Sequence, residues 1–364
     1  MANRLKPSRI DPWPYPVRLE EDELLSSYLV RSAHAHGTTA YRFMSLHFPG
    51  RPVWSRDVDR TVDRGWLRQV SEASGTPIDA LEGSTLVPFR QIVGSVGQGG
   101  DTPLLLSVSV FNRVRRRHGL QFCPTCLKEG RHWFRKRWRL GFYVRCEIHE
   151  VPLEDCCPVC TSPIAPHRGN RLDLIFCSEC GASLTRHQDP CPIPGSVQAL
   201  QEELLAAVQG ATTPLVKPHR SDERLETVRR LLSILTPFRR HATIRNALGL
   251  GEPSHPRERR SQFEHARIAE RILMLETVAA IKNKWPGNFL VAAHAGGLTQ
   301  QTFRRMHLPP QILEGVSLLP LGHRRQRRNV PKIFDRSLQS LARRSPDLYR
   351  QIRAQRLIAE VGWA

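Results

Sequence analysis

The chain has no long apolar run. Its longest mostly apolar stretch, residues 104–111, is interrupted by serines and is too short to span a bilayer. Residues 1–8 have no apolar core of the kind that a signal peptide requires. We therefore expect a cytoplasmic protein with no membrane partner.

Two signatures of catalysis are also missing. No glycine-rich phosphate loop with its lysine occurs, which excludes an ATPase of that class. No spaced trio of carboxylates stands out as the metal-binding core of a recombinase. Asp57, Asp59 and Asp63 lie close together in the sequence, but acids at that density are typical of solvated helix faces. We therefore expect a protein that is not an enzyme.

Acidic residues are scarce relative to basic ones. The 364 residues include 54 Lys and Arg but only 34 Asp and Glu, which gives a net charge of +20. The hydrophobic content of 40% and the charged content of 24% are typical of a soluble globular protein, and the length allows two or three domains. Such a charge favours a polyanionic partner, with nucleic acid first and acidic membrane surfaces second.

Cysteine is absent outside residues 123–191, and inside that range it follows a repeated spacing. Four pairs of ligand-type residues each enclose two other residues, so one short turn can aim both side chains at one ion. In a reducing compartment such cysteines are better interpreted as zinc ligands than as disulfides. The pattern predicts two structural Zn²⁺ ions. The predicted ligands are Cys123, Cys126, Cys146 and His149 for one ion, and Cys157, Cys160, Cys177 and Cys180 for the other.

Which two ligand pairs share an ion is open in principle, because the first pair could share an ion with the third pair and the second pair with the fourth. Sequential pairing is favoured, since it closes shorter loops. Cys156 directly precedes Cys157, but the spacing to Cys160 favours Cys157 as the ligand and leaves Cys156 spare. Inert buried cysteines at accidental spacing are the alternative, which four such pairs disfavour. Four protein ligands leave no position for water, so the ions should not be catalytic.

The predicted fold class is mainly α-helical, with small zinc-ribbon or zinc-finger β elements. Apolar residues recur at helical spacing on both sides of the cysteine region, and a proline-rich linker follows it at 190–195. We expect three parts. They are an N-terminal helical region over 1–117, a double zinc-finger region over 118–189, and a C-terminal helical domain with a helix-turn-helix over 190–364.

Residues 290–305 have the pattern of that helix-turn-helix. Ala293 would lie where two helices cross closely, Gly297 would supply the turn, and Thr299 would cap the second helix. The alternative is an ordinary helical hairpin in a bundle, and a weaker candidate for the same motif spans 243–250. The nucleic-acid-binding residues predicted in this segment are Thr299, Gln300, Gln301, Arg304 and Arg305.

Three basic clusters lie at 113–117, 135–139 and 323–328. Charge runs are usually solvated faces, but with a net charge of +20 we expect at least one cluster to touch phosphate. The third cluster suits a loop that contacts a nucleic-acid backbone. Aromatic residues at 133, 134 and 138 accompany the second cluster; we expect them to pack in the core, with base stacking as the alternative. The backbone-contacting residues predicted in the third cluster are Arg324, Arg325, Arg327 and Arg328.

Three features resemble the TniQ family, the target-selection proteins of transposons related to TnsD. Pro14-Tyr-Pro16, followed by residues 23–31 (Glu-Leu-Leu-Ser-Ser-Tyr-Leu-Val-Arg), is similar to the opening helix of the family, with Tyr28 in place of the usual Trp. Residues 81–86 (Leu-Glu-Gly-Ser-Thr-Leu) are similar to the segment that precedes the zinc region. The ligand run itself, with Trp138 and Leu153 inside it, is the most specific feature. The resemblance covers about residues 10–187.

This resemblance implies an adaptor of DNA transposition. Members of the family recognise a target either directly on DNA or through an RNA-guided CRISPR effector of the Cascade type. They then recruit an AAA+ ATPase of the TnsC or TniB type, which activates the transposase. The partners implied for this chain are therefore DNA or a guide-RNA complex and that ATPase, and a homodimer is compatible with the sequence.

The alternative function is a zinc-containing transcriptional regulator that binds DNA through the helix-turn-helix alone. An enzyme such as a nuclease ranks lower.

Overall fold

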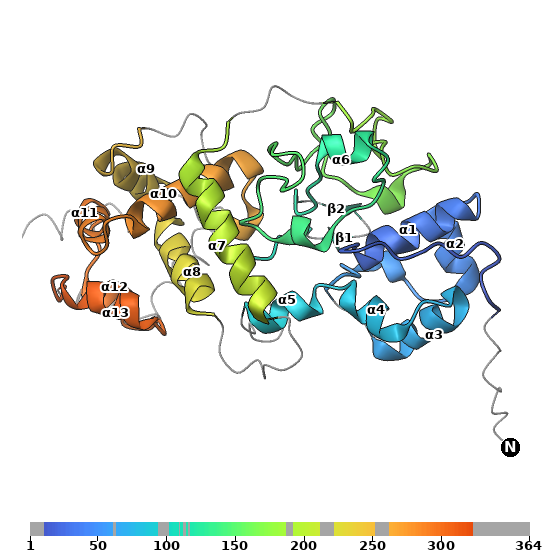
Figure 1. Ribbon diagram of the computed structural model, residues 1–364, viewed down its shortest axis with the longest axis horizontal. Coiled ribbons are helices and arrows are strands. Elements are labelled where there is room, and N and C mark those ends of the chain that lie inside the picture. The colour runs from blue at the N-terminus through green and yellow to red at the C-terminus, as the bar shows by residue number, and fades with distance from the viewer. Residues whose placement is uncertain are drawn as a thin grey trace, which may run out of the picture. The chain divides into compact units, whose positions relative to one another are not determined.

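The computed structural model describes nine stretches of the chain, which are residues 11–60, 63–93, 102–108, 110–111, 114–115, 117–186, 192–211, 222–251 and 262–322. These stretches hold thirteen α-helices and a single two-stranded ladder, so the expected mainly helical class is confirmed (Figure 1). The described residues from 11 to 320 belong to one compact unit. None of the described helices is long and apolar enough to cross a membrane.

The N-terminal helices surround one strongly apolar helix, α1 (Leu25–Ala35). The apolar residues at positions 24, 25, 28, 29 and 33 are all fully buried, as their helical spacing predicts. Gly37, with φ of +65°, follows the end of the helix, where a left-handed glycine commonly ends a helix. The other elements here are α2 (Ala40–His47), the 3₁₀ helix η1 (Val53–Ser55), α3 (Arg64–Ser74), α4 (Ile78–Gly83) and α5 (Val87–Ile92).

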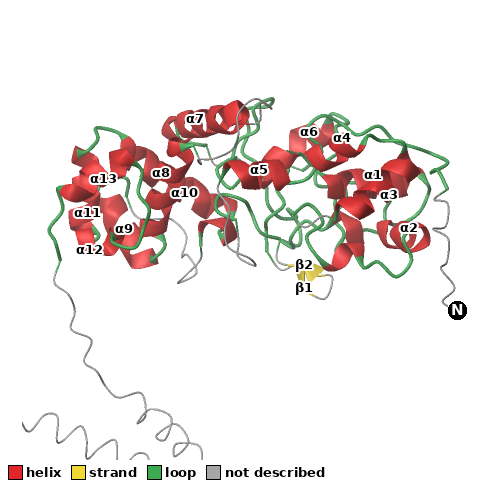
Figure 2. Cartoon of the chain, turned by 90° about the horizontal axis from the view of Figure 1, so that it is seen from below, coloured by secondary structure: helices red, strands yellow, loops and turns green. Residues whose placement is uncertain are grey.

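The cysteine-rich region contains little regular structure. Its helices are α6 (Pro124–Lys128) and the 3₁₀ helices η2 (Lys136–Arg139) and η3 (Pro166–Arg168). The expected β elements are reduced to isolated bridges beside the turns, such as Phe122 with Glu154 and Phe176 with Ser183. The described ladder lies before this region: β1 (Val110–Phe111) pairs antiparallel with β2 (Val114–Arg115), shown in yellow in Figure 2.

The C-terminal half is helical throughout its described residues. Helix α10 packs against α7, α8 and α11, and α9 packs against α11. The elements are α7 (Gly195–Ala211), α8 (Glu223–Leu235), α9 (Phe238–Ala247), the 3₁₀ helix η4 (Phe263–His265), α10 (Ile268–Lys282), α11 (Gly287–Ala295), α12 (Gln300–Phe303) and α13 (Pro310–Ser317).

Buried polar contacts join the C-terminal helices to the cysteine-rich region. The Gln201 side chain of α7 accepts hydrogen bonds from the backbone N–H groups of Val144 and Arg145, at 2.8 and 3.0 Å. Arg271 of α10 is fully buried and donates to the carbonyl of Gly141 at 2.7 Å and to Gln121 Oε1 at 2.9 Å. Such contacts cross the expected boundary near 189, and the expected boundaries near 117 and 189 stay predictions.

Candidate metal centres and nucleic-acid interface

The first four predicted ligands meet at one point. Cys123, Cys126, Cys146 and His149 place one ligand atom each within 4.8 Å of all the others. The Sγ atoms of Cys126 and Cys146 are 3.8 Å apart, and His149 Nδ1 lies 3.3 to 3.6 Å from the three sulfurs. A tetrahedral zinc ion with bonds of about 2.3 Å to sulfur separates its ligand atoms by about 3.8 Å. The cluster therefore has the dimensions of a closed zinc site.

The other four predicted ligands form a second cluster of the same size. The Sγ atoms of Cys157 and Cys180 are 3.6 Å apart, and those of Cys160 and Cys177 are 3.7 Å apart. All four sulfurs lie within 4.8 Å of one another. The clusters thus correspond to sequential pairing of the ligand pairs, and not to the interleaved arrangement.

Three of the ligand pairs are built on the same tight turn. In each, the residue after the second ligand has a left-handed backbone and donates its N–H to the carbonyl of the first ligand, at 2.9 to 3.0 Å. Two of these residues, Glu150 and Thr161, have φ near +58° although they are not glycines, a conformation that costs about 1 kcal/mol. Contacts around the clusters therefore stabilise a turn whose backbone is strained at these two residues. The third such residue is Gly181.

Glu129 supports the first cluster from outside. His149 Nε2 lies 2.8 Å from Glu129 Oε2, while its Nδ1 faces the three sulfurs. A histidine that binds a metal through one ring nitrogen commonly donates the other N–H to a carboxylate, which fixes its orientation. The spacing of the cysteines gives no sign of this residue, because Glu129 belongs to none of the ligand pairs.

Cys156 is not part of either cluster. Its sulfur is buried and accepts a hydrogen bond from Arg267 Nη2 at 2.8 Å, and burial raises the pKa of this thiol to about 11. The adjacent Cys157 supplies the cluster ligand. This agrees with the expectation that Cys156 is spare.

The basic cluster at 135–139 is largely neutralised inside the protein. Arg139 is fully buried in an ion-pair network with Asp57 and Asp59, at 2.6 and 3.2 Å. Arg137 contacts the carboxylates of Asp22 and Glu147. The interpretation of Asp57, Asp59 and Asp63 as a solvated helix face is therefore wrong for Asp59. This residue is 0% exposed, and its ion pair with Arg139 offsets the cost of burying its charge.

The neighbouring aromatic residues pack as expected. Phe134 and Trp138 are fully buried, with their rings edge to face at 6.2 Å between centroids. Trp133 is half-buried, and Arg31 and Arg135 each lie 5.9 Å from the centroid of its ring. Two of the three rings are thus unavailable for stacking on bases.

The opening helix contains a buried ion pair that explains part of its motif. Glu23 is 1% exposed, and its carboxylate accepts hydrogen bonds from Arg31 at 2.7 Å and from the Ser27 hydroxyl at 2.8 Å. Arg31 is also 3.5 Å from Glu20. The acid and the arginine at either end of residues 23–31 therefore fix the start of α1 to the chain that precedes it.

Comparison with protein families identifies part of the chain. Residues 14–153 match the TniQ family. This segment is a TniQ domain. TniQ proteins are non-catalytic factors of transposition, so the domain implies a part in target selection. No curated protein matches the chain.

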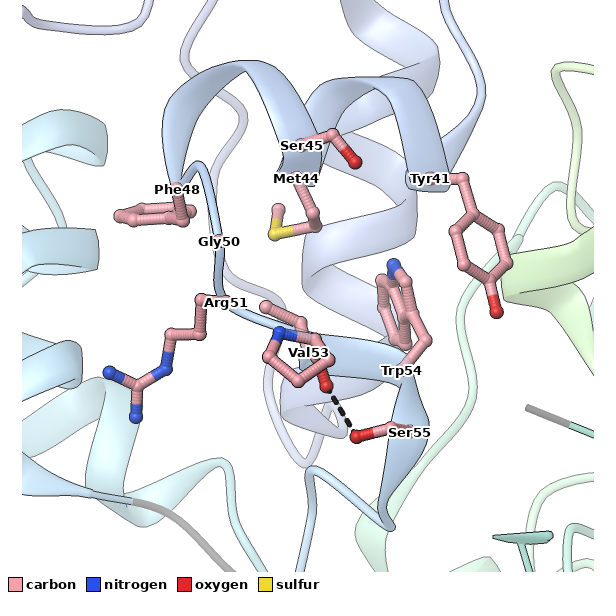
Figure 3. Close-up of a pocket in the computed structure, with 10 residues that line it drawn as sticks. Tyr41, Met44, Ser45, Phe48, Gly50, Arg51, Val53, Trp54 and Ser55 are labelled. Carbon is pink, nitrogen blue, oxygen red and sulfur yellow. Dashed lines mark hydrogen bonds between the residues drawn. The ribbon is translucent and has the colours of Figure 1, made fainter. Parts of the chain in front are cut away.

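The TniQ domain contains the whole first cluster, whereas the second cluster lies beyond its last matched residue, Leu153. The second cluster nevertheless packs onto the domain. Its element η3 contacts α1 and α2, and the His167 ring stacks on Trp54 with 5.0 Å between centroids. An open pocket of about 250 Å³ lies between α2 and η1, with Tyr41 and Trp54 at one end and Arg51 at the other (Figure 3).

The predicted helix-turn-helix has a short second helix. Ala293 is fully buried, Gly297 has φ of +60°, and Thr299 precedes α12 in a capping box with Thr302, as the pattern predicts. Helix α12, however, has only four residues. The Gln300 amide donates to the carbonyls of α13's C-terminal end at 2.8 and 3.2 Å, so it holds α13 in place.

The remaining predicted contacts of this segment are exposed. Gln301, Arg304 and Arg305 all have solvent-exposed side chains. The weaker candidate at 243–250 coincides with the end of α9, where Arg245 is buried against Glu276 at 2.8 Å. The predicted residues Arg324, Arg325, Arg327 and Arg328 lie outside the described residues, so their role stays a prediction.

Proposed function

We propose that this chain is a target-selection adaptor of DNA transposition that recruits an AAA+ ATPase of the TnsC or TniB type to the target. The observation behind this proposal is a TniQ domain whose buried core includes a closed four-ligand cluster. Such a domain is a rigid platform for partners rather than a centre of chemistry, because four protein ligands leave no position for a substrate.

We propose that both clusters hold structural Zn²⁺. The ligands are Cys123, Cys126, Cys146 and His149 in one, and Cys157, Cys160, Cys177 and Cys180 in the other. Thiolate and imidazole sets of this kind favour zinc, and the separations between their ligand atoms fit its tetrahedral bonds.

We propose that the target is reached by direct contact with DNA, through Gln301, Arg304, Arg305 and the basic cluster at 323–328. The exposed cations after α12 and the net charge of +20 support a contact with a nucleic-acid backbone, as this route requires. The four-residue α12 disfavours the alternative of a transcriptional regulator, because one helical turn presents few side chains to a major groove.

Affinity purification of the full chain from its host tests this function. We expect an AAA+ ATPase and DNA among the co-purified molecules, and we expect deletion of the chain to abolish targeted insertion. Co-purification of a guide RNA with effector subunits would instead show that the chain reaches its target through that complex, and the proposed direct contact with DNA would fail. A chain that binds one promoter and recruits no ATPase would instead be a regulator, and the adaptor proposal would fail.

A further inference from the structure

Two stretches of the C-terminal half contain no acidic residue. Neither Asp nor Glu occurs in 227–251 or in 277–313, although 34 acids are distributed over the whole chain. Helix α9 lies in the first stretch, and α11 and α12 lie in the second. Nothing in the linear sequence indicates that these stretches are neighbours, because α10 separates them.

The fold places the two stretches against each other. Helices α9 and α11 are packing partners, and in Figure 1 α11 lies between α9 and α12. The contact is closest at Gly296, in the turn that joins α11 to α12. A Cβ atom at this glycine would lie 3.0 Å from Ile244 Cδ1 and 3.2 Å from Arg240 Cγ. The side chain of Arg240 therefore lies directly beside the turn. We call α9, the turn and α12 with residues 304–305 the acid-free face.

The cations of the acid-free face differ from those around it. The cations of α8 and α10 lie within 4.0 Å of acids, and the pairs are Arg224–Asp222, Arg229–Glu226, Arg230–Glu226, Arg271–Asp155 and Lys282–Glu203. On α9, the buried Arg245 is also paired, with Glu276. Among the described residues, no ion pair engages the four cations on either side of the turn, which are Arg239, Arg240, Arg304 and Arg305.

The chemistry of the exposed side chains indicates what this face binds. Arg239 and Asn246 are exposed on one face of α9, and the Thr243 hydroxyl between them donates to the Arg239 carbonyl at 2.9 Å, so this face presents the donors of Arg239 and Asn246 and no carboxylate. Unpaired bases need aromatic platforms for stacking. Phe289 and Phe303 are buried and Phe238 is half-buried, so the described residues of α9, α11 and α12 expose no Phe, Tyr or Trp ring; their exposed ring is the imidazole of His294. Donors without platforms suit the phosphate backbone of a duplex.

We propose that α9 is a second DNA-contacting element, in which Arg239 and Arg240 contact duplex phosphates beside those contacted by Arg304 and Arg305. This inference rests on the proposed contact of DNA by the C-terminal half. It adds a helix outside the main helix-turn-helix candidate at 290–305 and makes the interface a composite of two segments that are distant in the sequence. The surface recognises charge and shape and leaves sequence reading to other residues.

The test measures binding of a short duplex DNA of unrelated sequence by the full chain over a series of salt concentrations. The double variant R239Q/R240Q should bind several-fold more weakly. It should flatten the slope of log K against log salt by roughly 2, since each phosphate contact contributes about 0.9. The single variant R239Q should flatten it by about half as much. Zinc content and circular dichroism verify that the variants are folded.

The matched control is R42Q/R68Q, which removes the same charge from exposed positions on α2 and α3. If R239Q/R240Q behaves like this control while R304Q/R305Q flattens the slope, the inference about α9 is overturned and the proposed contact by α12 stands. If neither R239Q/R240Q nor R304Q/R305Q changes the slope, the inference about α9 and the proposed DNA contact by α12 both fail. Recruitment of the ATPase is a separate part of the proposed function, and co-purification tests it. A loss seen with duplex RNA but not with DNA also overturns the inference.

Discussion

Glu23 in the TniQ domain is an ionisable residue whose side chain is buried. Burial raises the pKa of Glu23 from its ordinary value of 4.5 to about 7, and Arg31 opposes this shift only in part. A carboxyl whose pKa is raised on folding binds a proton more readily in the native state than in the unfolded state. Its contribution to stability is therefore present below pH 4.5 and is lost as the pH rises through 7.

This gives a prediction for the variant E23Q. The amide does not titrate, so the free energy of unfolding of the natural chain minus that of E23Q should fall by about 3 kcal/mol between pH 4.5 and pH 8. Urea unfolding of both proteins at a series of pH values measures this difference. A difference independent of pH would show that folding leaves the pKa of Glu23 unchanged, which would contradict the prediction.

Residue spacing in the sequence predicts which residues form the two ligand clusters, but it does not predict which charged side chains are buried in ion pairs. Two intervening residues define each ligand pair locally, so spacing alone identified the members of both clusters. Asp59 and Arg139 are 80 residues apart, and their burial depends on tertiary contacts that no local pattern encodes. The same holds for Glu129, which reaches His149 across 20 residues.

At the scale of elements, the repeated turn makes neighbouring cysteines unequal. Cys157 begins such a turn and accepts the N–H of Val159 at 3.4 Å, whereas Cys156 points to Arg267. The variant C157S should lower the zinc content from two ions to one per chain, and C156S should keep two.

Metal analysis of the purified variants tests this prediction, and limited proteolysis should show cleavage near η3 in C157S alone. Equal loss of zinc from both variants would contradict the assignment of Cys156 as spare.

The sequence predicts the extent of α1 but not that of α12. Helix α1 has an apolar stripe that is buried throughout, so its period of 3.6 residues revealed it. Helix α12 has the right cap and turn, yet it ends after Phe303, and Pro309 and Pro310 then begin α13. Capping residues mark where a helix starts, but the length that follows depends on packing, here on the bond of Gln300 to α13.

At the scale of the whole molecule, a few buried groups hold the C-terminal helices to the cysteine-rich region. Burial lowers the pKa of Arg271 to about 10, so it remains a cation at neutral pH. Its guanidinium donates to Gly141, Gln121 and Ala266, and Asp155 lies 4.0 Å away. Asp155 in turn accepts from the N–H of Ile268, the first residue of α10, at 2.7 Å.

The variant R271M should therefore cost about 3–5 kcal/mol, because it leaves buried acceptors and Asp155 without this cation. It should also separate two events on heating, with loss of helix preceding release of zinc. Circular dichroism and a zinc-sensitive dye follow the two events. In the control R224M, which removes an exposed cation that pairs with Asp222, the two events should stay coincident.

The stack of His167 on Trp54 also bears on how such chains can be recombined. The matched segment ends at Leu153, yet Trp54 inside it is covered by a residue beyond that end, and Gln121 inside it binds Arg271 far beyond it. The segment that matches the family and the unit that folds therefore end at different places. A chimaera joined after Leu153 would sever both contacts, whereas a graft that retains η3 and α10 with the domain would preserve them.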